Sequence, residues 1–216
     1  MPLPNFAHLQ ADPALLLPWL EGNLLRAIAP FPNVANPPGT FAATIVQGTL
    51  YPGGGGGNAV AVNSNGVPMG VFDLGTQGVA GAAATIPSYL CNYTAGGVNE
   101  VILGNLGDFC FTVNLNGCTF GIGLAQPNHT RRVSHANSGG NTLLQRGQTQ
   151  AIHHVGANMA GVSLLEPAEY RRMAPTMQAT VFGIRTGLVW RFYFQSYSSH
   201  GHGNYRVYGV YPIPAP

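Results

Sequence analysis

Apolar residues are spaced in two different ways along the chain, and the change comes near residue 40. Before it they recur every three or four positions, which predicts a helix over 12–28. Asp12 is a suitable N-cap, and Pro13 suits the first helical position. Pro18 leaves open a start made of two short turns, and a proline-rich connector follows over 30–39. The apolar helix positions are Leu15, Leu16, Trp19, Leu20, Leu24 and Ile28.

After residue 40 the apolar residues alternate with polar ones or form short runs, which is typical of strands and turns. The pattern predicts two β-hairpins, one with its turn at 126–129 and one with its turn around Thr186 and Gly187. A short helix is predicted over 166–173, with Pro167 in its first turn. The predicted strands and turns cover 41–50, 58–63, 67–74, 78–86, 100–106, 109–115, 118–124, 131–135, 179–185, 188–197 and 205–211.

This order of elements predicts an α+β protein with a single domain over residues 1–216 and a central β-sandwich of mixed strands. The helical and proline-rich segment 1–39 is expected to pack on that sandwich. Only 7% of the residues are charged, against a usual quarter or so, while 45% are hydrophobic. A chain of this length and composition buries a sizeable core and is not disordered.

The charge of the chain argues against several kinds of partner. The net charge is only +2 and the nine basic residues are scattered, so we expect no nucleic-acid partner.

No apolar stretch approaches a membrane span, and the first residues lack a Sec-type signal, so export would need dedicated machinery or a larger parent protein. All nine basic residues are arginine. GC-rich coding explains this, and so does avoidance of ubiquitination in a foreign cytosol.

Cysteine and histidine spacing argues against a metal or a disulfide framework. Cys91, Cys110 and Cys118 are odd in number and not spaced like zinc ligands, so we expect a reduced compartment and no disulfide. The His153–His154 pair and the His200, His202 pair have no neighbouring carboxylate or cysteine, so no metal is expected. The glycine run 53–57 lacks the Lys-Ser/Thr of a phosphate loop. We expect no cofactor.

The central hairpin brings a thiol and an imidazole together. Because side chains alternate along a strand, Cys118 shares a face with Phe120 and Ile122, and His135 lies on the facing strand. With Pro127 and Asn128 at the turn centre, Cys118 lies opposite Asn137 and diagonal to His135. A turn shifted by one residue puts His135 directly opposite. Both registers keep Cys118 and His135 on one face, within side-chain reach.

This pair is the minimum equipment for nucleophilic acyl chemistry. The imidazole of His135 takes the thiol proton of Cys118, and the thiolate attacks an amide carbonyl. Gly117 permits an unusual backbone turn before the nucleophile, which frees the Cys118 amide as first oxyanion donor. A backbone carbonyl or a carboxylate would orient the imidazole. The plainer interpretation remains that Cys118 is a small buried hydrophobe and His135 a strand-end histidine.

Other residues are weaker candidates for the same chemistry. Cys110 lies within a strand between two phenylalanines, and Cys91 has no imidazole near it in the sequence. His129 belongs to the turn and is expected to point away from Cys118.

Two segments resemble the glutamine deamidase toxins of the cytotoxic necrotizing factor and Burkholderia lethal factor type. Residues 111–118, Phe-Thr-Val-Asn-Leu-Asn-Gly-Cys, resemble the nucleophile segment, which carries Leu-Ser-Gly-Cys at a strand start, although Asn116 replaces the serine. Residues 181–187, Val-Phe-Gly-Ile-Arg-Thr-Gly, look like the late Gly-Ile-x-Thr-Gly hairpin of the lethal factor. The two segments follow the family's order and, with the residues that continue them, cover about a third of the chain.

The resemblance implies a β-sandwich flanked by helices, with Cys118 as nucleophile, His135 as base and acid, and the backbone carbonyl of Thr112 orienting the imidazole. It implies a monomeric toxin, secreted by a bacterium and acting in the host cytosol. The implied partner is a host protein, a Rho-type GTPase or a translation-initiation RNA helicase, whose glutamine becomes glutamate. Two alternatives stay open. One is a cysteine peptidase or transglutaminase, and the other is a non-catalytic β-rich binding module, which the low charge and many aromatics suit.

Overall fold

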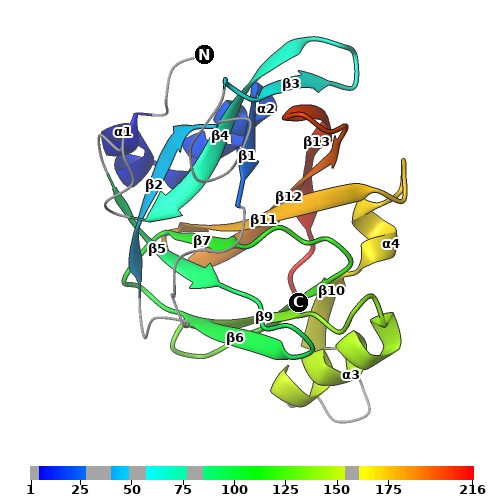
Figure 1. The fold of residues 1–216 in the computed structure, drawn as a ribbon. Helices are drawn as coiled ribbons and strands as arrows, with labels where there is room; N and C mark the ends of the chain where they lie inside the picture. Colours follow the sequence, from blue (N-terminus) through cyan, green and yellow to red (C-terminus); the bar gives the residue numbers. More distant parts are fainter. Residues whose placement is uncertain (1–4, 28–39, 49–56, 77–84, 154–160) are drawn as a thin grey trace.

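The computed structural model describes residues 5–27, 40–48, 57–76, 85–153 and 161–216. Strands dominate these residues, and the helices are few and short (Figure 1). The helical elements are α1 (Phe6–Ala11), η1 (Pro13–Leu15), α2 (Leu16–Glu21), α3 (Thr142–His153) and α4 (Pro167–Tyr170). The strands are β1 (Asn23–Arg26), β2 (Phe41–Gln47), β3 (Val60–Asn63), β4 (Pro68–Thr76), β5 (Ile86–Cys91), β6 (Val98–Leu103), β7 (Phe109–Thr112), β8 (Thr119–Ala125), β9 (Arg131–Ala136), β10 (Val162–Leu165), β11 (Met177–Thr186), β12 (Val189–Ser199) and β13 (Asn204–Ile213).

The larger sheet closes into a barrel. Its order is β4-β2-β5-β7-β11-β12-β13-β3, and β3 pairs again with β4, so eight strands form a ring. Closure removes the free edges that an open sheet would expose. The predicted sandwich is therefore corrected, because a barrel wall takes the place of one of its two open sheets. The sequence pattern could not predict this, since closure depends on β4 pairing with strands on both sides.

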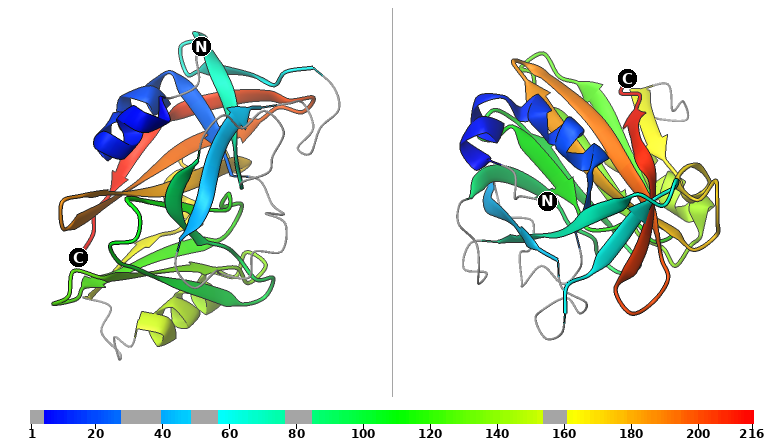
Figure 2. Two further views of the ribbon diagram at one scale, coloured as in Figure 1. Left: turned by 90° about the vertical axis from the view of Figure 1, so that its left-hand side faces the viewer. Right: turned by 90° about the horizontal axis from the view of Figure 1, so that it is seen from above.

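The second sheet packs on the outside of the barrel. Its order is β10-β8-β9-β6, with all pairs antiparallel. Side chains of β8 and β9 and of the barrel wall share one core, which makes the two sheets parts of one domain. Helix α3 covers the other face of this sheet, and the N-terminal helices lie on the opposite side of the molecule (Figure 2). Gly121 permits the close approach of α3, because a Cβ there would sit 2.5 Å from Thr149 Cγ2.

The N-terminal segment differs from the predicted helix over 12–28. Asp12 caps a 3₁₀ turn with Pro13 at its start, as expected, and its side chain accepts a hydrogen bond from the Ala14 N–H. The helix ends at Glu21 with Gly22 as its C-cap. Residues 23–26 then form β1, which pairs in parallel with β4 over 70–73. Tertiary pairing thus overrides the helical spacing of Leu24, and Ile28 lies outside the described residues.

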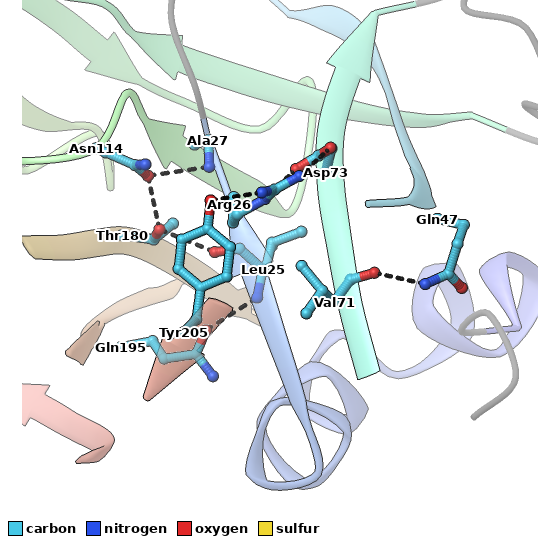
Figure 3. Close-up of polar contacts among 10 residues, drawn as sticks. All are labelled: Leu25, Arg26, Ala27, Gln47, Val71, Asp73, Asn114, Thr180, Gln195 and Tyr205. Atoms are coloured by element: carbon cyan, nitrogen blue, oxygen red, sulfur yellow. Dashed lines mark hydrogen bonds and ion pairs between the residues drawn. The ribbon is translucent and has the colours of Figure 1, made fainter. Parts of the chain in front are cut away.

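Strand β1 runs inside the barrel wall, and all four of its residues are buried. Its free edge is hydrogen-bonded by side chains instead of a strand. Gln195 of β12 accepts from the Leu25 N–H at 3.0 Å and donates to the Asn23 carbonyl at 2.7 Å. The Thr180 hydroxyl of β11 lies 2.9 Å from the Leu25 carbonyl. Figure 3 shows the contacts of Gln195 and Thr180 with Leu25, and these bonds, with that to Asn23, satisfy buried backbone groups of β1.

Arg26 is the largest fully buried side chain in this region, with 0% of it exposed. Its guanidinium makes a two-pronged ion pair with Asp73, at 2.6 and 2.7 Å, and donates to the Tyr205 hydroxyl at 2.7 Å. Burial alone lowers the pKa of Arg26, but the bonds to Asp73 and Tyr205 more than offset it, so its pKa is raised (Figure 3). The charge is therefore retained within the barrel.

The remaining sequence predictions fared unevenly. The hairpin around Thr186 and Gly187 and the strand over 205–211 are confirmed, and Gly187 has a φ of +61° that suits its turn. The helix predicted over 166–173 is shorter, since α4 ends at Tyr170. Helix α3 and strand β10 were not predicted, and β5 was predicted only at its first residue. The expected segments over 30–39, 53–56 and 78–84 lie outside the described residues.

Candidate functional site

Cys118 sits in a turn that joins the barrel to the second sheet. The turn follows an isolated bridge between Leu115 and Ala179 of β11, and Cys118 comes one residue before β8. Gly117 has a φ of +92°, a conformation that side-chain-bearing residues rarely adopt. The predicted role of Gly117, an unusual backbone turn directly before the cysteine, agrees with this geometry.

The turn is held by hydrogen bonds from two helices. The Tyr170 hydroxyl of α4 accepts from the Gly117 N–H at 2.8 Å and donates to the Cys118 carbonyl at 3.1 Å. Gln145 of α3 donates to the Gly117 carbonyl at 2.8 Å and accepts from the Thr119 hydroxyl at 2.6 Å. Both Tyr170 and Gln145 are almost fully buried. Three of these bonds hold the backbone of Gly117 and Cys118, and the fourth holds the Thr119 side chain that follows.

Cys118 lines a pocket of about 280 Å³. The cysteine itself is 6% exposed, so its sulfur lies low in the pocket without being sealed from it. The lining contains no charged side chain, and four of its members carry a carboxamide. The other lining residues are Tyr93, Val113, Asn114, Asn116, Asn137 and Gln178.

Burial and the neighbouring polar groups shift the pKa of the Cys118 thiol in opposite directions. Burial raises the pKa of the Cys118 thiol, because the thiolate is poorly solvated there. The Asn116 backbone N–H and the Arg171 guanidinium counter this rise, but the pKa remains above its ordinary value. Cys118 is therefore mostly protonated at neutral pH, and a base or cation must help it to ionise.

His135 lies on the same face of the second sheet as Cys118. His135 pairs with Phe120, and Ala136 pairs with Thr119. Extending this register by one residue places Asn137 opposite Cys118. This is the first of the two predicted registers, in which His135 is diagonal to the thiol. The pairing shifts only near the turn, between Ile122 and Ala125.

The imidazole of His135 is completely buried, and neither ring nitrogen has a hydrogen-bond partner. Burial lowers the pKa of His135 to about 4, because the imidazolium would be unsolvated. The Cys91 carbonyl lies near enough to favour the charged form slightly, without the geometry of a hydrogen bond. The Tyr93 ring packs nearby, with its centroid 6.0 Å from that of His135. His135 is therefore neutral at pH 7.

The predicted orienting carbonyl of Thr112 requires correction. No hydrogen bond joins it to His135, because both ring nitrogens lack a partner. Thr112 is on β7, beside Cys91 of β5 in the parallel pairing, and the carbonyl near the imidazole is that of Cys91. The carbonyl that influences the imidazole thus comes from β5 and not from Thr112 on β7.

His135 is not among the residues that line the pocket, and neither are the other sulfur and imidazole groups of the described residues. Cys91 and Cys110 are fully buried, and burial raises the pKa of both thiols. His129 is exposed in its turn with a φ of +61°. The ring of His153 is 3.0 Å from the Ser134 hydroxyl, on the α3 side of the second sheet. Within the described residues no group of three or more His, Cys, Asp or Glu side chains could hold a metal ion.

Sequence reasoning missed the residues that hold the turn at Gly117 and Cys118. Gln145 lies on an unpredicted helix, and nothing in the local pattern links Tyr170 or Arg171 to residues more than 50 positions earlier. The sequence signal that existed was the start of α4, where Glu166 and Glu169 form a capping box around Pro167. That box fixes the helix whose last residue is Tyr170.

No protein-family model matches the chain, and a search of curated protein sequences finds no match either. Of the helices in the described residues, none is both long and apolar enough to span a membrane.

Proposed function

We propose that the chain is a protein-glutamine deamidase with Cys118 as nucleophile and His135 as general base and acid. The observation that carries the proposal is the pocket lining at Cys118. Apart from the thiol and the Tyr93 phenol, its polar side chains are all carboxamides. A carboxamide both donates and accepts hydrogen bonds, so a wall of carboxamides complements a glutamine side chain.

The chemistry balances with water as the only co-substrate. Sulfur of Cys118 bonds to the glutamine Cδ while a ring nitrogen of His135 takes the thiol proton. The C–N bond then breaks, and the imidazolium gives its proton to the departing ammonia. Water adds to the thioester, the C–S bond breaks, and glutamate and the thiol are released. The backbone N–H of Cys118, turned by Gly117, is the proposed oxyanion donor.

His135 suits the role of base because its low pKa leaves it neutral and able to accept a proton at pH 7. Its diagonal position relative to Cys118 is within reach of a long side-chain contact, and such contacts commonly tighten when substrate binds. The imidazolium that forms would be short-lived, because neither ring nitrogen has a hydrogen-bond partner and only the nearby Cys91 carbonyl favours the charged form.

The proposal extends to the setting of the reaction. The resemblance of segments 111–118 and 181–187 to deamidase toxins supports a bacterial effector that acts, as a monomer, on a host protein in the host cytosol. A Rho-type GTPase or a translation-initiation RNA helicase is the proposed class of target.

A non-catalytic β-rich binding module is the second candidate. The complete burial of His135 and the raised pKa of the Cys118 thiol favour it, because both are what an inert buried pair would show. A peptidase or transglutaminase uses the same thioester and differs only in the scissile bond or in the acceptor.

Mass spectrometry of host-cell lysate separates these candidates. Lysate treated with the wild-type protein should gain glutamine-to-glutamate changes, and Cys118→Ala should reduce their rate about a thousandfold or more. Cys110→Ala, which removes a buried thiol from the same core, is the matched control and should stay active. Incorporation of a labelled primary amine would indicate a transglutaminase, and peptide cleavage a peptidase. A lysate left unchanged by the wild-type protein would refute the proposed enzymatic activity.

A further inference from the structure

Arg171 lies against the nucleophile turn with no carboxylate to neutralise it. Its guanidinium donates to Asn116 Oδ1 at 2.8 Å and to the Met177 carbonyl at 3.2 Å, and both partners are uncharged. The guanidinium carbon also sits 5.8 Å from the ring centroid of Tyr170. Among the described residues Arg171 takes part in no ion pair, whereas Arg26, Arg132, Arg146 and Arg185 each pair with an acid.

The guanidinium lies in van der Waals contact distance of the turn. A Cβ built on Gly117 would lie 3.4 Å from Arg171 Nη2, while the positive φ of Gly117 accounts for the glycine at this position. Asn116 and Cys118 flank Gly117, and the cation therefore lies beside the residue that carries the thiol. The positive charge is close enough to lower the pKa of Cys118.

The buried histidine makes a second source of positive charge necessary. A thiolate–imidazolium pair would place an unsolvated cation at His135, where no group bonds to either nitrogen. Arg171 is partly exposed, carries a guanidinium and is already held in place by Asn116 and Met177. A fixed guanidinium thus stabilises the thiolate that remains once His135 has taken the thiol proton.

We propose that Arg171 is the electrostatic partner of the Cys118 thiolate and positions the nucleophile turn through Asn116. This inference rests on the proposed role of Cys118 as nucleophile. The ionisable groups that face the thiol are Arg171, the Tyr170 hydroxyl from α4, the Tyr93 phenol at the pocket and His135 from β9. Of these, Arg171 alone is a permanent cation.

The test is the pH dependence of Cys118 alkylation by iodoacetamide, followed peptide by peptide so that Cys91 and Cys110 are scored separately. Arg171→Gln should shift the Cys118 profile to higher pH and slow alkylation at pH 7 about three- to tenfold. Arg171→Lys keeps the positive charge but loses the planar guanidinium, and it should recover most of the alkylation rate of Cys118. Arg172→Gln, at the exposed neighbouring position, should match wild type.

A purely structural Arg171 would leave the alkylation profile of Arg171→Gln superimposed on that of wild type, and this result would overturn the inference. If Arg171→Gln does not fold, Asn116→Ala replaces it, since it frees the guanidinium and should give a smaller shift in the same direction. An unchanged Asn116→Ala profile would then refute the role. Alkylation needs no substrate, so these outcomes are independent of whether lysate proteins are deamidated.

Discussion

The molecule holds two buried polar regions, and they are built in opposite ways. Inside the barrel, Arg26 is fully buried, yet Asp73 and Tyr205 meet its guanidinium with three bonds. Between the barrel and the second sheet, His135 is equally buried, yet neither of its ring nitrogens has a partner. The first region holds a charge that is paired, and the second holds a base that is kept neutral.

The two regions differ in how the buried group is satisfied. Asp73 and Tyr205 bond to the buried guanidinium of Arg26, as buried polar groups usually require. The imidazole of His135 has no such partner, which lowers stability and agrees with the catalytic role proposed for it. Packing around Cys118 is not loose, because Tyr170 and Gln145 bond to both backbone groups of Gly117 and to the Cys118 carbonyl.

The largest expected effect comes from breaking the paired region. Arg26→Met leaves the Asp73 carboxylate and the Tyr205 hydroxyl without their buried partner, and we expect it to lower the free energy of unfolding by about 3–5 kcal/mol. Urea denaturation measures this. Arg206→Met, at an exposed position, is the control and should change little. The double variant Arg26→Met with Asp73→Leu should recover most of the loss. A wild-type stability in Arg26→Met alone would show that the pair is not structural.

The unpaired imidazole of His135 should make the stability of the protein depend on pH below neutrality. The native pKa of His135 is about 4 and the unfolded value 6.5, so between these pH values the unfolded chain binds the extra proton. Stability therefore falls as the pH drops from 6.5 towards 4, and this histidine contributes about 3 kcal/mol of that loss at pH 4. Above pH 6.5 it contributes no pH dependence.

Urea denaturation of wild type and His135→Leu at pH 7 and pH 4 isolates this contribution. The difference in stability between the two proteins should move by about 3 kcal/mol in favour of the leucine variant at the lower pH. The exposed His8→Gln variant should follow wild type. Parallel pH profiles for wild type and His135→Leu would mean that the imidazole is solvated or bonded in solution, and the contrast with Arg26 would disappear.

Sequence alone predicted the parts of the site that local alternation determines. Period-two alternation placed Cys118 and His135 on one face. Of the two registers left open by the turn, the one centred on Pro127 and Asn128 is the one that pairs Phe120 with His135. Gly117 was recognised as a turn because only glycine takes its φ readily. These features depend on residues close together in the chain, where backbone geometry leaves few choices.

The parts that were missed depend on distant pairing or on an atypical pattern. β1 has leucines at helical spacing, and its strand state follows from β4 and from side chains 155 to 170 residues away. Helix α3 was missed because its buried face carries Gln145 and Thr149 while Leu143 and Leu144 are exposed, the reverse of an amphipathic pattern. The buried polar face of α3 is explained by the hydrogen bonds that Gln145 makes to Gly117 and Thr119, on either side of Cys118.

The smallest effect is expected where the two regions meet, at Asn114. Its Oδ1 accepts from the Ala27 N–H at 3.0 Å and lies 2.8 Å from the Thr180 hydroxyl, while the residue also lines the Cys118 pocket. Asn114→Asp keeps the accepting oxygen, so the free energy of unfolding should change by less than about 1 kcal/mol. The new negative charge disfavours the thiolate, and Cys118 alkylation at pH 7 should slow about threefold.

Asn114→Leu is the opposite change and separates the two roles of the residue. It adds no charge but leaves the Ala27 N–H unpaired, so it should lower stability by about 1–2 kcal/mol in urea. Asn137→Asp, which adds the same charge to the pocket away from β1, should slow alkylation as Asn114→Asp does. If Asn114→Asp instead destabilises the fold and leaves alkylation unchanged, the pocket and the barrel are one structural region. The division between a paired structural cluster and an unpaired chemical one would then be wrong.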